Sequence, residues 1–176
     1  MKFGNFDIEI RLARSKDAAG IVTHWNENFK RGFSKYTGTN RSRNKIDARQ
    51  LSKSLALKKK NDFVFIAIDR KAKKVIGTSN FSARDKGRTR HRGGMSWEIN
   101  YRYARLGIGT ALVKAILEEA KRRGFKKAQA EVAVENTASL KLAKNCGFRI
   151  EGRRKIGMLL DDGRYVDTYT FGKVLK

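Results

Sequence analysis

One stretch of this sequence constrains the fold more than any other: an amphipathic helix that directly follows two closely spaced glycines. Apolar residues recur every three or four positions, at Ile108, Ala111, Leu112, Ala115, Ile116 and Ala120. Charged residues occupy the opposite face, and Gly124 stands where a helix C-terminus is expected. The pattern predicts a helix that begins at Gly107 and covers a sheet with its apolar face.

Strand patterns flank this helix on both sides. Residues 94–102 predict a strand that leads into the glycines, and residues 127–134 alternate, with alanines and valines on one face. A strand, a helix and a strand in succession favour a right-handed crossover between two parallel strands.

The rest of the chain adds elements around this unit. Strands are expected over residues 6–13, 62–69 and 74–83, and two more on either side of the turn signal Asp161-Asp162-Gly163. Helices are expected to start at Ser15 or Asp17, to span about residues 46–60, and to run from Asn136 to Gly147; residues 32–43 form a loop. The predicted fold class is mixed α/β, with a largely antiparallel central sheet, one parallel crossover and helices on both faces.

Apolar spacing also predicts the packing residues of the first two helices. In the first helix these are Ala18, Ile21, Val22, Trp25 and Phe29. In the second helix they are Leu51, Leu55 and Leu57.

Composition narrows the class of protein. The 176 residues suit one domain over residues 1–176, and 40% of them are hydrophobic, which argues against disorder. No apolar run approaches the roughly 18 residues of a membrane span, and the N-terminus lacks a secretion signal. One cysteine excludes an intramolecular disulfide, and with only two histidines a metal site is not expected. The expected location is cytoplasmic.

The formal net charge of +24 is extreme. Such a field attracts polyanions at low salt, so nucleic acid, the ribosome, an acidic peptide or a phosphorylated cofactor could each exploit it. A proteome-wide bias toward lysine and arginine explains the charge equally well, because the basic residues are spread along the chain. The densest groups are Lys58–Lys60 and Arg88–Arg92.

The glycine loop carries the clearest chemistry. Gly107 and Gly109 allow a backbone to approach a ligand closely, and the first amides of the following helix have no intrahelical acceptor. Such a helix start binds phosphate without a charged side chain, and Arg102 and Arg105 can add attraction. The loop is neither a Walker loop nor a complete dinucleotide fingerprint.

The sequence here resembles a known family. The run Arg-Leu-Gly-Ile-Gly-Thr-Ala-Leu, followed by Ala-Glu-Val-Ala-Val-Glu-Asn-Thr-Ala-Ser and Cys-Gly-Phe, resembles the GCN5-related N-acetyltransferases (GNAT family) over residues 94–149. The C-terminal part of the sequence is similar to that of one branch of this family, which contains ribosomal-protein N-terminal and L-amino-acid acetyltransferases. The resemblance implies a sheet that splays at its parallel strand pair, with acetyl-CoA in the gap.

The resemblance also implies that backbone amides of the loop bind the CoA pyrophosphate. The loop residues assigned to this role are Ala104, Arg105, Leu106, Gly107, Ile108, Gly109 and Thr110. Ala104 replaces the family's usual Gln or Arg, so weaker or redistributed binding is expected. The strand edge at Ile99, Asn100 and Tyr101 is expected to pair with the pantetheine amides, as an added strand does.

Residues after the next strand complete the expected cofactor site. Asn136 matches the family's asparagine that contacts the CoA arm, yet asparagine is also among the best helix N-caps, and both roles can hold. Ser139 follows three residues later on the same side. Lys141 and Lys144 are expected to reach the adenosine phosphates, unless they are simply solvated charges.

The acid that protonates the departing thiolate is not the usual one. The family's tyrosine falls at Ala143, and similarity to the branch with Asn-x-x-Ser favours Ser139 as the substitute. Ser139 could instead bond only its own helix backbone. A thiol titrates near 8.5, so a weaker acid is tolerable.

The base must take a proton from the incoming amine. Glu98 is the first candidate by its place on the strand, although it could instead pair with an arginine; Glu131 and Glu135 are the next. His24 and His91 are assigned to a helix face and a turn, and Cys146 to packing.

Two classes of function follow. The first is acetyl transfer to a primary amine by direct attack on the thioester, with a protein N-terminus, an amino acid or another small amine as acceptor. The second is a basic nucleic-acid- or ribosome-binding module without catalysis, motivated by charge alone. Polyamines are disfavoured unless Asp161, Asp162 and Asp167 form an acidic pocket. Monomer and homodimer both remain open.

Overall fold

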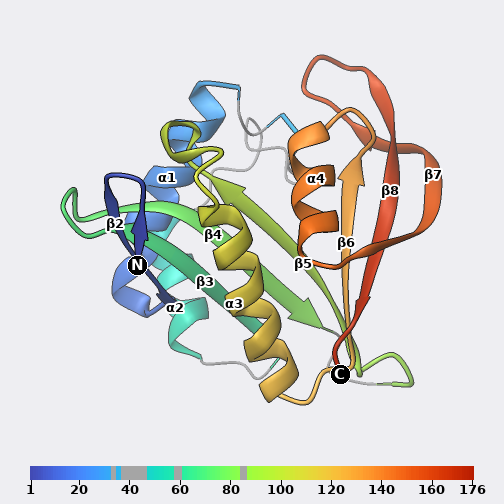
Figure 1. Ribbon diagram of the computed structural model, residues 1–176, viewed down its shortest axis with the longest axis horizontal. Helices are drawn as coiled ribbons and strands as arrows, with labels where there is room; N and C mark the ends of the chain where they lie inside the picture. Colours follow the sequence, from blue (N-terminus) through green and yellow to red (C-terminus); the bar gives the residue numbers. More distant parts are fainter. Residues whose placement is uncertain (33–34, 37–46, 58–60, 84–86) are drawn as a thin grey trace.

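The computed structural model of the chain describes residues 1–32, 35–36, 47–57, 61–83 and 87–176. Eight strands of this part form one sheet in the order β1-β2-β3-β4-β5-β6-β8-β7 (Figure 1). Their bounds are β1 Lys2–Phe3, β2 Phe6–Leu12, β3 Asp62–Asp69, β4 Lys74–Ala83, β5 Arg92–Ile99, β6 Lys127–Ala133, β7 Arg149–Leu159 and β8 Tyr165–Val174. Every neighbouring pair is antiparallel except β5 and β6, which confirms the predicted fold class.

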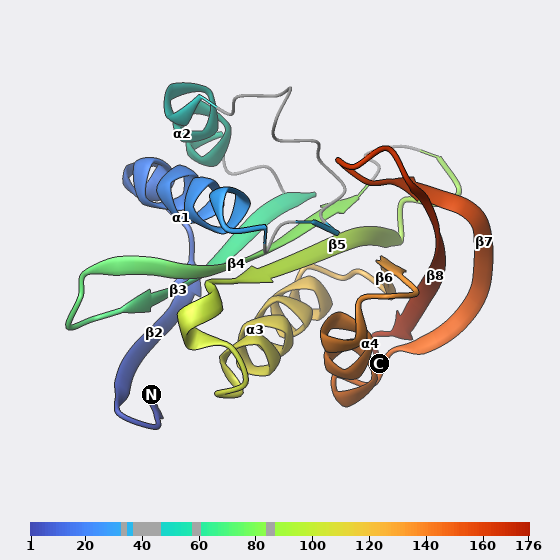
Figure 2. The same cartoon turned by 90° about the horizontal axis from the view of Figure 1, so that it is seen from above.

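Helices cover both faces of the sheet, as predicted (Figure 2). One face carries α1 (Ala18–Lys30), which follows the 3-10 turn η1 (Ser15–Asp17), and α2 (Ala48–Ala56). The other face carries α3 (Ile108–Arg122) and α4 (Thr137–Asn145). A second 3-10 turn, η2 (Tyr101–Tyr103), lies between β5 and α3. Most of the predicted loop over residues 32–43 and both ends of the predicted second helix lie outside the described residues.

The larger core lies beneath α3 and α4. The predicted apolar face of α3 is buried, with Ile108, Leu112, Ile116 and Ala120 all 0% exposed. Ala128, Ala130 and Val132 of β6 meet this helix side together with buried phenylalanines of β4, β8 and the α4–β7 connection. The 3.6-residue period of α3 and the two-residue period of β6 therefore point the apolar atoms of both elements into the same layer.

The helix face that α1 turns to the sheet is partly polar, which apolar spacing did not predict. Ile21 and Trp25 are buried as expected, but so are His24 and Asn28, both 0% exposed. The predicted contact Phe29 is only half-buried. Polar side chains are favoured here because this stretch of α1 lies over polar groups near the end of β5.

The prediction for Leu57 was wrong. Its side chain is 67% exposed and it lies just beyond the end of α2, whereas Leu51 and Leu55 pack against the core under α1. A residue that follows the last helical turn no longer shares the face of that helix.

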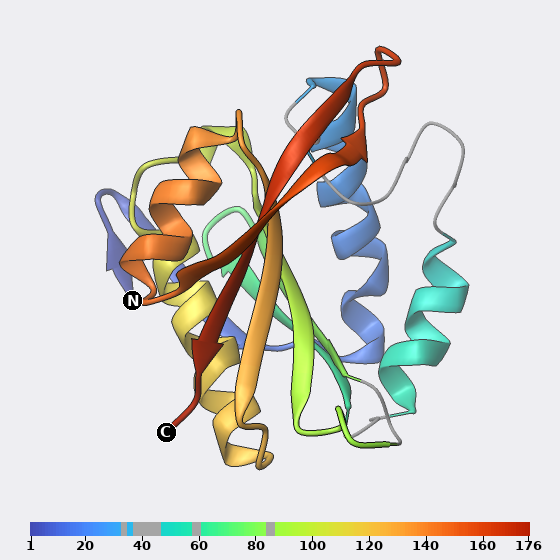
Figure 3. The ribbon, with the colours of Figure 1, turned by 90° about the vertical axis from the view of Figure 1, so that its right-hand side faces the viewer.

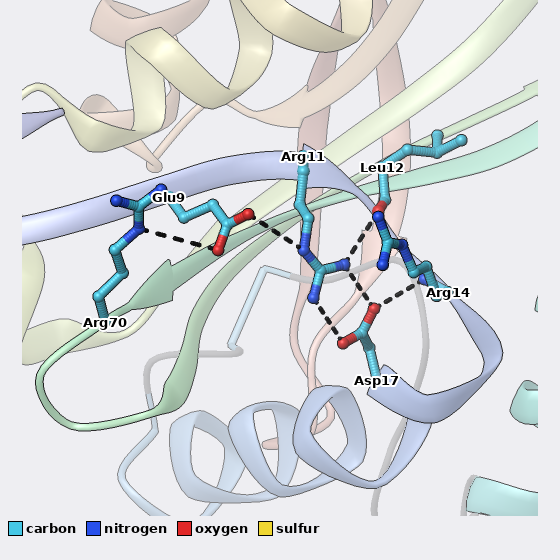
Figure 4. Close-up of polar contacts among 6 residues, drawn as sticks. All are labelled: Glu9, Arg11, Leu12, Arg14, Asp17 and Arg70. Atoms are coloured by element: carbon cyan, nitrogen blue, oxygen red, sulfur yellow. Dashed lines mark hydrogen bonds and ion pairs between the residues drawn. The ribbon is translucent and has the colours of Figure 1, made fainter.

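An ion pair fixes the start of α1 to β2 (Figure 4). Arg11 donates from its two terminal nitrogens to both oxygens of Asp17, at 2.7 and 2.9 Å. The backbone N–H of Arg14 donates to the same carboxylate, at 2.7 Å. The hydrogen bond from Arg11 lowers the pKa of Asp17. The two-pronged geometry fixes the carboxylate in orientation as well as in charge.

The parallel pair opens along its length. β5 and β6 are in register only at Arg92–Gly94 with Lys127–Gln129, while β5 continues to Ile99 and β6 to Ala133. The two strands start close together near the C-terminus of the chain and diverge toward the start of α3 and α4 (Figure 1). Figure 3 shows the β7–β8 hairpin rising beside β6 to the end of the molecule that holds the C-terminus of α1.

Candidate active site

The glycine loop forms the expected helix start. Gly107 is the N-cap of α3 in a left-handed conformation, with φ 83° and ψ −6°, and it is exposed. Within the described part of the chain, no side chain accepts a hydrogen bond from the amides of Ile108, Gly109 or Thr110. A row of backbone donors with the positive end of the helix dipole behind it is a site for an anion.

The N-terminal hairpin supports this loop from behind. A Cβ atom on Gly107 would lie 3.9 Å from the ring of Phe3, and Leu106 packs with Phe3 in the same apolar cluster. Tyr103 donates its hydroxyl to buried Asp69, at 2.9 Å. Burial and then this hydrogen bond raise the pKa of Tyr103 to about 12. The loop is thus held in one shape by contacts remote in sequence.

Gly109 serves packing in addition to any ligand approach. A Cβ atom there would lie 2.8 Å from Cδ1 of Leu142 and 3.3 Å from Cγ1 of Ile99. The missing side chain lets α3 approach α4 and the end of β5 closely. These two neighbours are distant in sequence, so the pattern around Gly109 predicted only the approach of a ligand.

The free edge of β5 lies earlier than predicted. Gly77 faces Ile99, and the backbone N–H of Asn100 donates to Ile76 O at 2.7 Å. In an antiparallel ladder this register turns the N–H and C=O groups of Trp97 and Ile99 away from β4. Those groups therefore point toward the space where β6 has diverged.

Asn100 and Tyr101 do not form the expected strand edge. β5 ends at Ile99, and Asn100 is the N-cap of η2, with a side chain that accepts a hydrogen bond from Arg102 N. Tyr101 lies in η2, with the guanidinium of Arg31 4.7 Å above its ring. The prediction that the strand continues through these two residues was therefore wrong, and of the three expected edge residues Ile99 alone lies in β5.

Ser139 lies on the α4 side of the divergence. The indole N–H of Trp97 donates to Ser139 Oγ at 3.3 Å, across the gap between β5 and α4. Asn136 is the N-cap of α4, and its side chain accepts a hydrogen bond from Ser139 N at 3.1 Å. The capping role predicted for Asn136 is confirmed. Sequence analysis missed Trp97, although its place next to Glu98 on an alternating strand marked it for the opposite face.

Glu98 lies on the other face of β5, under α1. The side-chain amide of Asn28 donates to Glu98 Oε1 at 2.9 Å and to Ile99 O at 3.0 Å. Because side chains alternate along a strand, Trp97 and Glu98 open onto opposite sides of the same divergence. The two predicted catalytic residues, Glu98 and Ser139, therefore lie on opposite sides of β5.

The alternative carboxylates are engaged elsewhere. Glu131 accepts from the hydroxyl of Thr168 at 2.6 Å and pairs with Arg154. Glu135 accepts from the hydroxyl of Tyr36 at 3.2 Å and lies 3.6 Å from Arg164.

Four basic side chains lie exposed around the loop and α4: Arg102, Arg105, Lys141 and Lys144. None of them forms an ion pair with a residue that the structure describes, so their charges are available to phosphate groups. Ala143, at the position of the family's tyrosine, is 0% exposed in the core.

The remaining candidates take structural positions. His91 lies in an exposed turn. Cys146 is buried, its Sγ lies 4.0 Å from Thr110 O, and burial raises the pKa of its thiol. Among the described residues no group of histidine, cysteine and carboxylate side chains could hold a metal ion. No helix of this part of the chain is long and apolar enough to cross a membrane.

Two surface hollows lie away from this region. One is beside the C-terminal half of α3 and the other between the starts of α1 and α2. Neither of these two hollows is lined by the glycine loop.

Comparisons with known proteins agree with this geometry. A family model described as an acetyltransferase (GNAT) domain matches residues 7–149, which confirms the resemblance predicted from the sequence. A GNAT-family acetyltransferase from Streptococcus pneumoniae superposes with a TM-score of 0.85 at 27% identity, covering 96% of this chain and 99% of that one.

Two further solved structures share the fold. Ribosomal-protein-S5-alanine acetyltransferase from Vibrio fischeri has a TM-score of 0.84 at 21% identity, covering 100% of this chain and 96% of that one. The yncA protein of Salmonella typhimurium, solved with its cofactor acetyl-CoA, has a TM-score of 0.82 at 20% identity, covering 97% of this chain and 95% of that one.

Proposed function

This chain belongs to the GNAT acetyltransferase family, and from that premise we propose that it transfers an acetyl group from acetyl-CoA to a primary amine. One observation carries the proposal: the uncapped amides at the start of α3 lie beside the C-terminal end of β5, where that strand has diverged from β6. Phosphate at the first and a pantetheine arm at the second would place a thioester beside β5.

The residues present fit acetyl-CoA. The amides of Gly107 to Thr110 would hold the pyrophosphate, with added attraction from the exposed cations Arg105 and Lys144. The outward N–H and C=O groups of Trp97 and the outward N–H of Ile99 would pair with the pantetheine amides, while Ile99 O accepts from Asn28 Nδ2. When bound there, acetyl-CoA supplies the activated acetyl carbonyl that an amine attacks.

On the α1 side, Glu98 is the proposed base. An alkyl ammonium must lose a proton before it can attack, and the Glu98 carboxylate lies on the face that α1 covers. A backbone N–H of β5 that faces the divergence is the donor for the carbonyl oxygen as negative charge develops.

On the α4 side, Ser139 is the proposed acid. Trp97 donates to its oxygen, and the indole N–H has no capacity to accept in return. The serine proton is therefore available to another acceptor, and the hydrogen bond received from Trp97 polarises the hydroxyl toward donation.

The acceptor remains a proposal at the level of a primary amine: a protein N-terminus, an amino acid or another small amine. The ribosomal-protein acetyltransferase named above shares the fold at 21% identity, which makes an alanine N-terminus a reasonable first substrate to test. Cytoplasmic location, and proximity to a ribosome or nucleic acid through the net charge of +24, remain predictions.

Calorimetric titration with acetyl-CoA tests the proposal before any acceptor is known. We expect saturable binding in the micromolar range, typical of substrates for enzymes (about 1 μM to 1 mM). Folded protein that binds no acetyl-CoA at millimolar concentration would end the proposal. Release of free CoA in the presence of pooled amines then identifies the acceptor.

A further inference from the structure

Asn28 is a buried polar residue on the face of α1 that covers the sheet. It is 0% exposed, on the helix face that also buries Ile21, His24 and Trp25. A buried amide is expected to bond all its polar atoms. Asn28 Nδ2 does so, but Oδ1 is buried and accepts no hydrogen bond from any part of the chain that the structure describes.

The orientation of this amide follows from its partners. Nδ2 lies 2.9 Å from Glu98 Oε1 and 3.0 Å from Ile99 O, and both of these atoms only accept hydrogen bonds. The flipped amide would place Oδ1 against two acceptors, so the assignment is fixed by chemistry. The amide therefore places its N–H donor at these two atoms and leaves Oδ1 without a partner among the described residues.

Neighbouring residues of α1 hold the helix at this point. Trp25 Nε1 donates to Thr78 Oγ1 at 3.0 Å. Thr78 lies on β4 directly opposite Glu98 of β5. Glu27 accepts from Asn100 Nδ2 at 3.1 Å and from Lys74 Nζ at 2.6 Å. The end of α1 is thus bonded at several points to β4 and to the end of β5, and the placement of Asn28 is rigid.

We infer that Asn28 is a positioning residue that fixes the carboxylate of Glu98 for proton removal from the acceptor amine. The inference rests on the proposed function and adds a residue to it. One amide joins the carboxylate to the carbonyl of Ile99, the last residue of the strand edge beside the divergence. The base and that edge are therefore held at a constant separation.

A glutamate side chain that loses an orienting hydrogen bond samples more rotamers. Its distance to an amine nitrogen then varies more than a proton transfer tolerates. The hydrogen bond from Nδ2 to Oε1 limits this variation.

The test is Asn28→Asp, which keeps the shape of the side chain and replaces the donor with an acceptor. Acceptor probes are an alanine-initiated pentapeptide amide and free L-amino acids, with turnover followed by release of free CoA. We expect kcat to fall about 10- to 100-fold, as for loss of an orienting partner, while KM for acetyl-CoA changes by less than about threefold. Asn26→Asp is the matched control, because Asn26 is exposed on the same helix, and it should keep wild-type kcat.

A double-mutant cycle with Glu98→Gln separates positioning from general damage. When Glu98→Gln is already present, adding Asn28→Asp should reduce kcat by no more than about twofold further, because the carboxylate that Asn28 orients is already gone. The melting temperature gives a readout without any acceptor. Asn28→Asp should lower it in the wild-type background and lower it less together with Glu98→Gln, where the introduced amide can donate to the introduced carboxylate.

The outcomes are distinct. Equal losses of kcat or of melting temperature in both backgrounds would overturn the inference, as would wild-type kcat in Asn28→Asp. Failure of the wild-type protein to bind acetyl-CoA would instead remove the proposed function itself. Acetyl-CoA binding and turnover without sensitivity to Asn28→Asp would remove the positioning role alone.

Discussion

Two glycines at opposite ends of α3 show how much a single residue can decide. Gly107 and Gly124 both adopt left-handed conformations, with φ of 83° and 90°. Gly124 ends the helix, whereas Gly107 opens it and exposes the amides proposed to bind pyrophosphate. Equal backbone strain at the two positions should therefore have unequal consequences for function.

Gly107→Ala and Gly124→Ala form a matched pair. Each should cost about 1 kcal/mol of folding stability, because an L-residue is strained in this region, and lower the melting temperature by roughly 2–4 °C. Gly107→Ala should also weaken acetyl-CoA binding about tenfold, the equivalent of one charge-assisted hydrogen bond. Calorimetry that finds both variants equally impaired would refute the role of the loop.

Ser139→Ala removes the proposed acid and leaves the amide that Asn136 caps. We expect kcat to fall about tenfold, at the low end for general acids, because a thiolate with a pKa near 8.5 departs readily. Trp97→Phe should reproduce part of this loss by removing the donor to Ser139 Oγ. Steady-state rates of CoA release decide this, and a Ser139→Ala enzyme as fast as wild type would contradict it.

Tyr103 should confer an alkaline limit on stability. Its folded pKa of about 12 lies above the ordinary value of 10.0. Its contribution is fully present below pH about 10 and is lost as the pH rises toward 12. Tyr103→Phe should therefore lose less stability than wild type across that window in chemical denaturation at fixed temperature. An identical decline in the free energy of unfolding of both proteins would show that ionisation of Tyr103 does not affect stability.

Functional residues that follow from a local sequence pattern were predicted. Residues whose roles depend on contacts with residues distant in the sequence were missed. The amides after Gly107 follow from helix geometry alone. Asn28 and Trp97 acquire their roles from contacts across 70 and 42 positions, which no local pattern contains. Polar spacing on α1 was the available signal for Asn28, but apolar spacing favoured Phe29.

At the scale of elements, strands and helices were predicted well where periodicity was unbroken. β3 and β4 occupy their expected ranges, and the predicted start of α3 differs by one residue. The end of β5 was misplaced by three residues, because Asn100 starts a 3-10 turn by capping Arg102 N. That one turn redirects the strand edge, and with it the residues that can pair with a ligand.

The first turn of α4 offers a test that separates capping from cofactor binding. Asn136→Ser keeps a good N-cap, so the melting temperature should change by less than about 2 °C. It loses the side-chain amide donor, so acetyl-CoA should bind several-fold more weakly if Asn136 also contacts the CoA arm as proposed. Asn136→Ala, which lacks any cap, should lose about 1 kcal/mol of stability as well. Unchanged affinity in both variants would limit Asn136 to capping.

At the scale of the whole molecule, the antiparallel sheet with one parallel pair was predictable from the order of strand and helix patterns. The divergence of that pair was expected only through resemblance to a family, since no pattern within β5 or β6 encodes where pairing stops. The net charge of +24 is equally a property of the whole chain. This charge should first affect the binding of acetyl-CoA, because the phosphate groups of the cofactor are anionic.

Salt should therefore weaken acetyl-CoA binding. Raising KCl from about 50 mM to about 500 mM shortens the screening length from roughly 14 Å to roughly 4 Å, which removes attraction from all but adjacent cations. Acetyl-pantetheine, which lacks the adenosine phosphates and the pyrophosphate, is the control and should bind with little salt dependence. Equal salt dependence for both ligands would mean that the basic surface does not act on the phosphates.

The most direct measurement is an amide-resolved NMR titration with acetyl-CoA. We expect the amide signals of Ile108, Gly109 and Thr110 to shift on binding together with that of Ile99, while those of Arg123 and Gly124 at the far end of α3 stay unchanged. Saturable binding of acetyl-CoA that leaves the signals of Ile108 to Thr110 in place would contradict it.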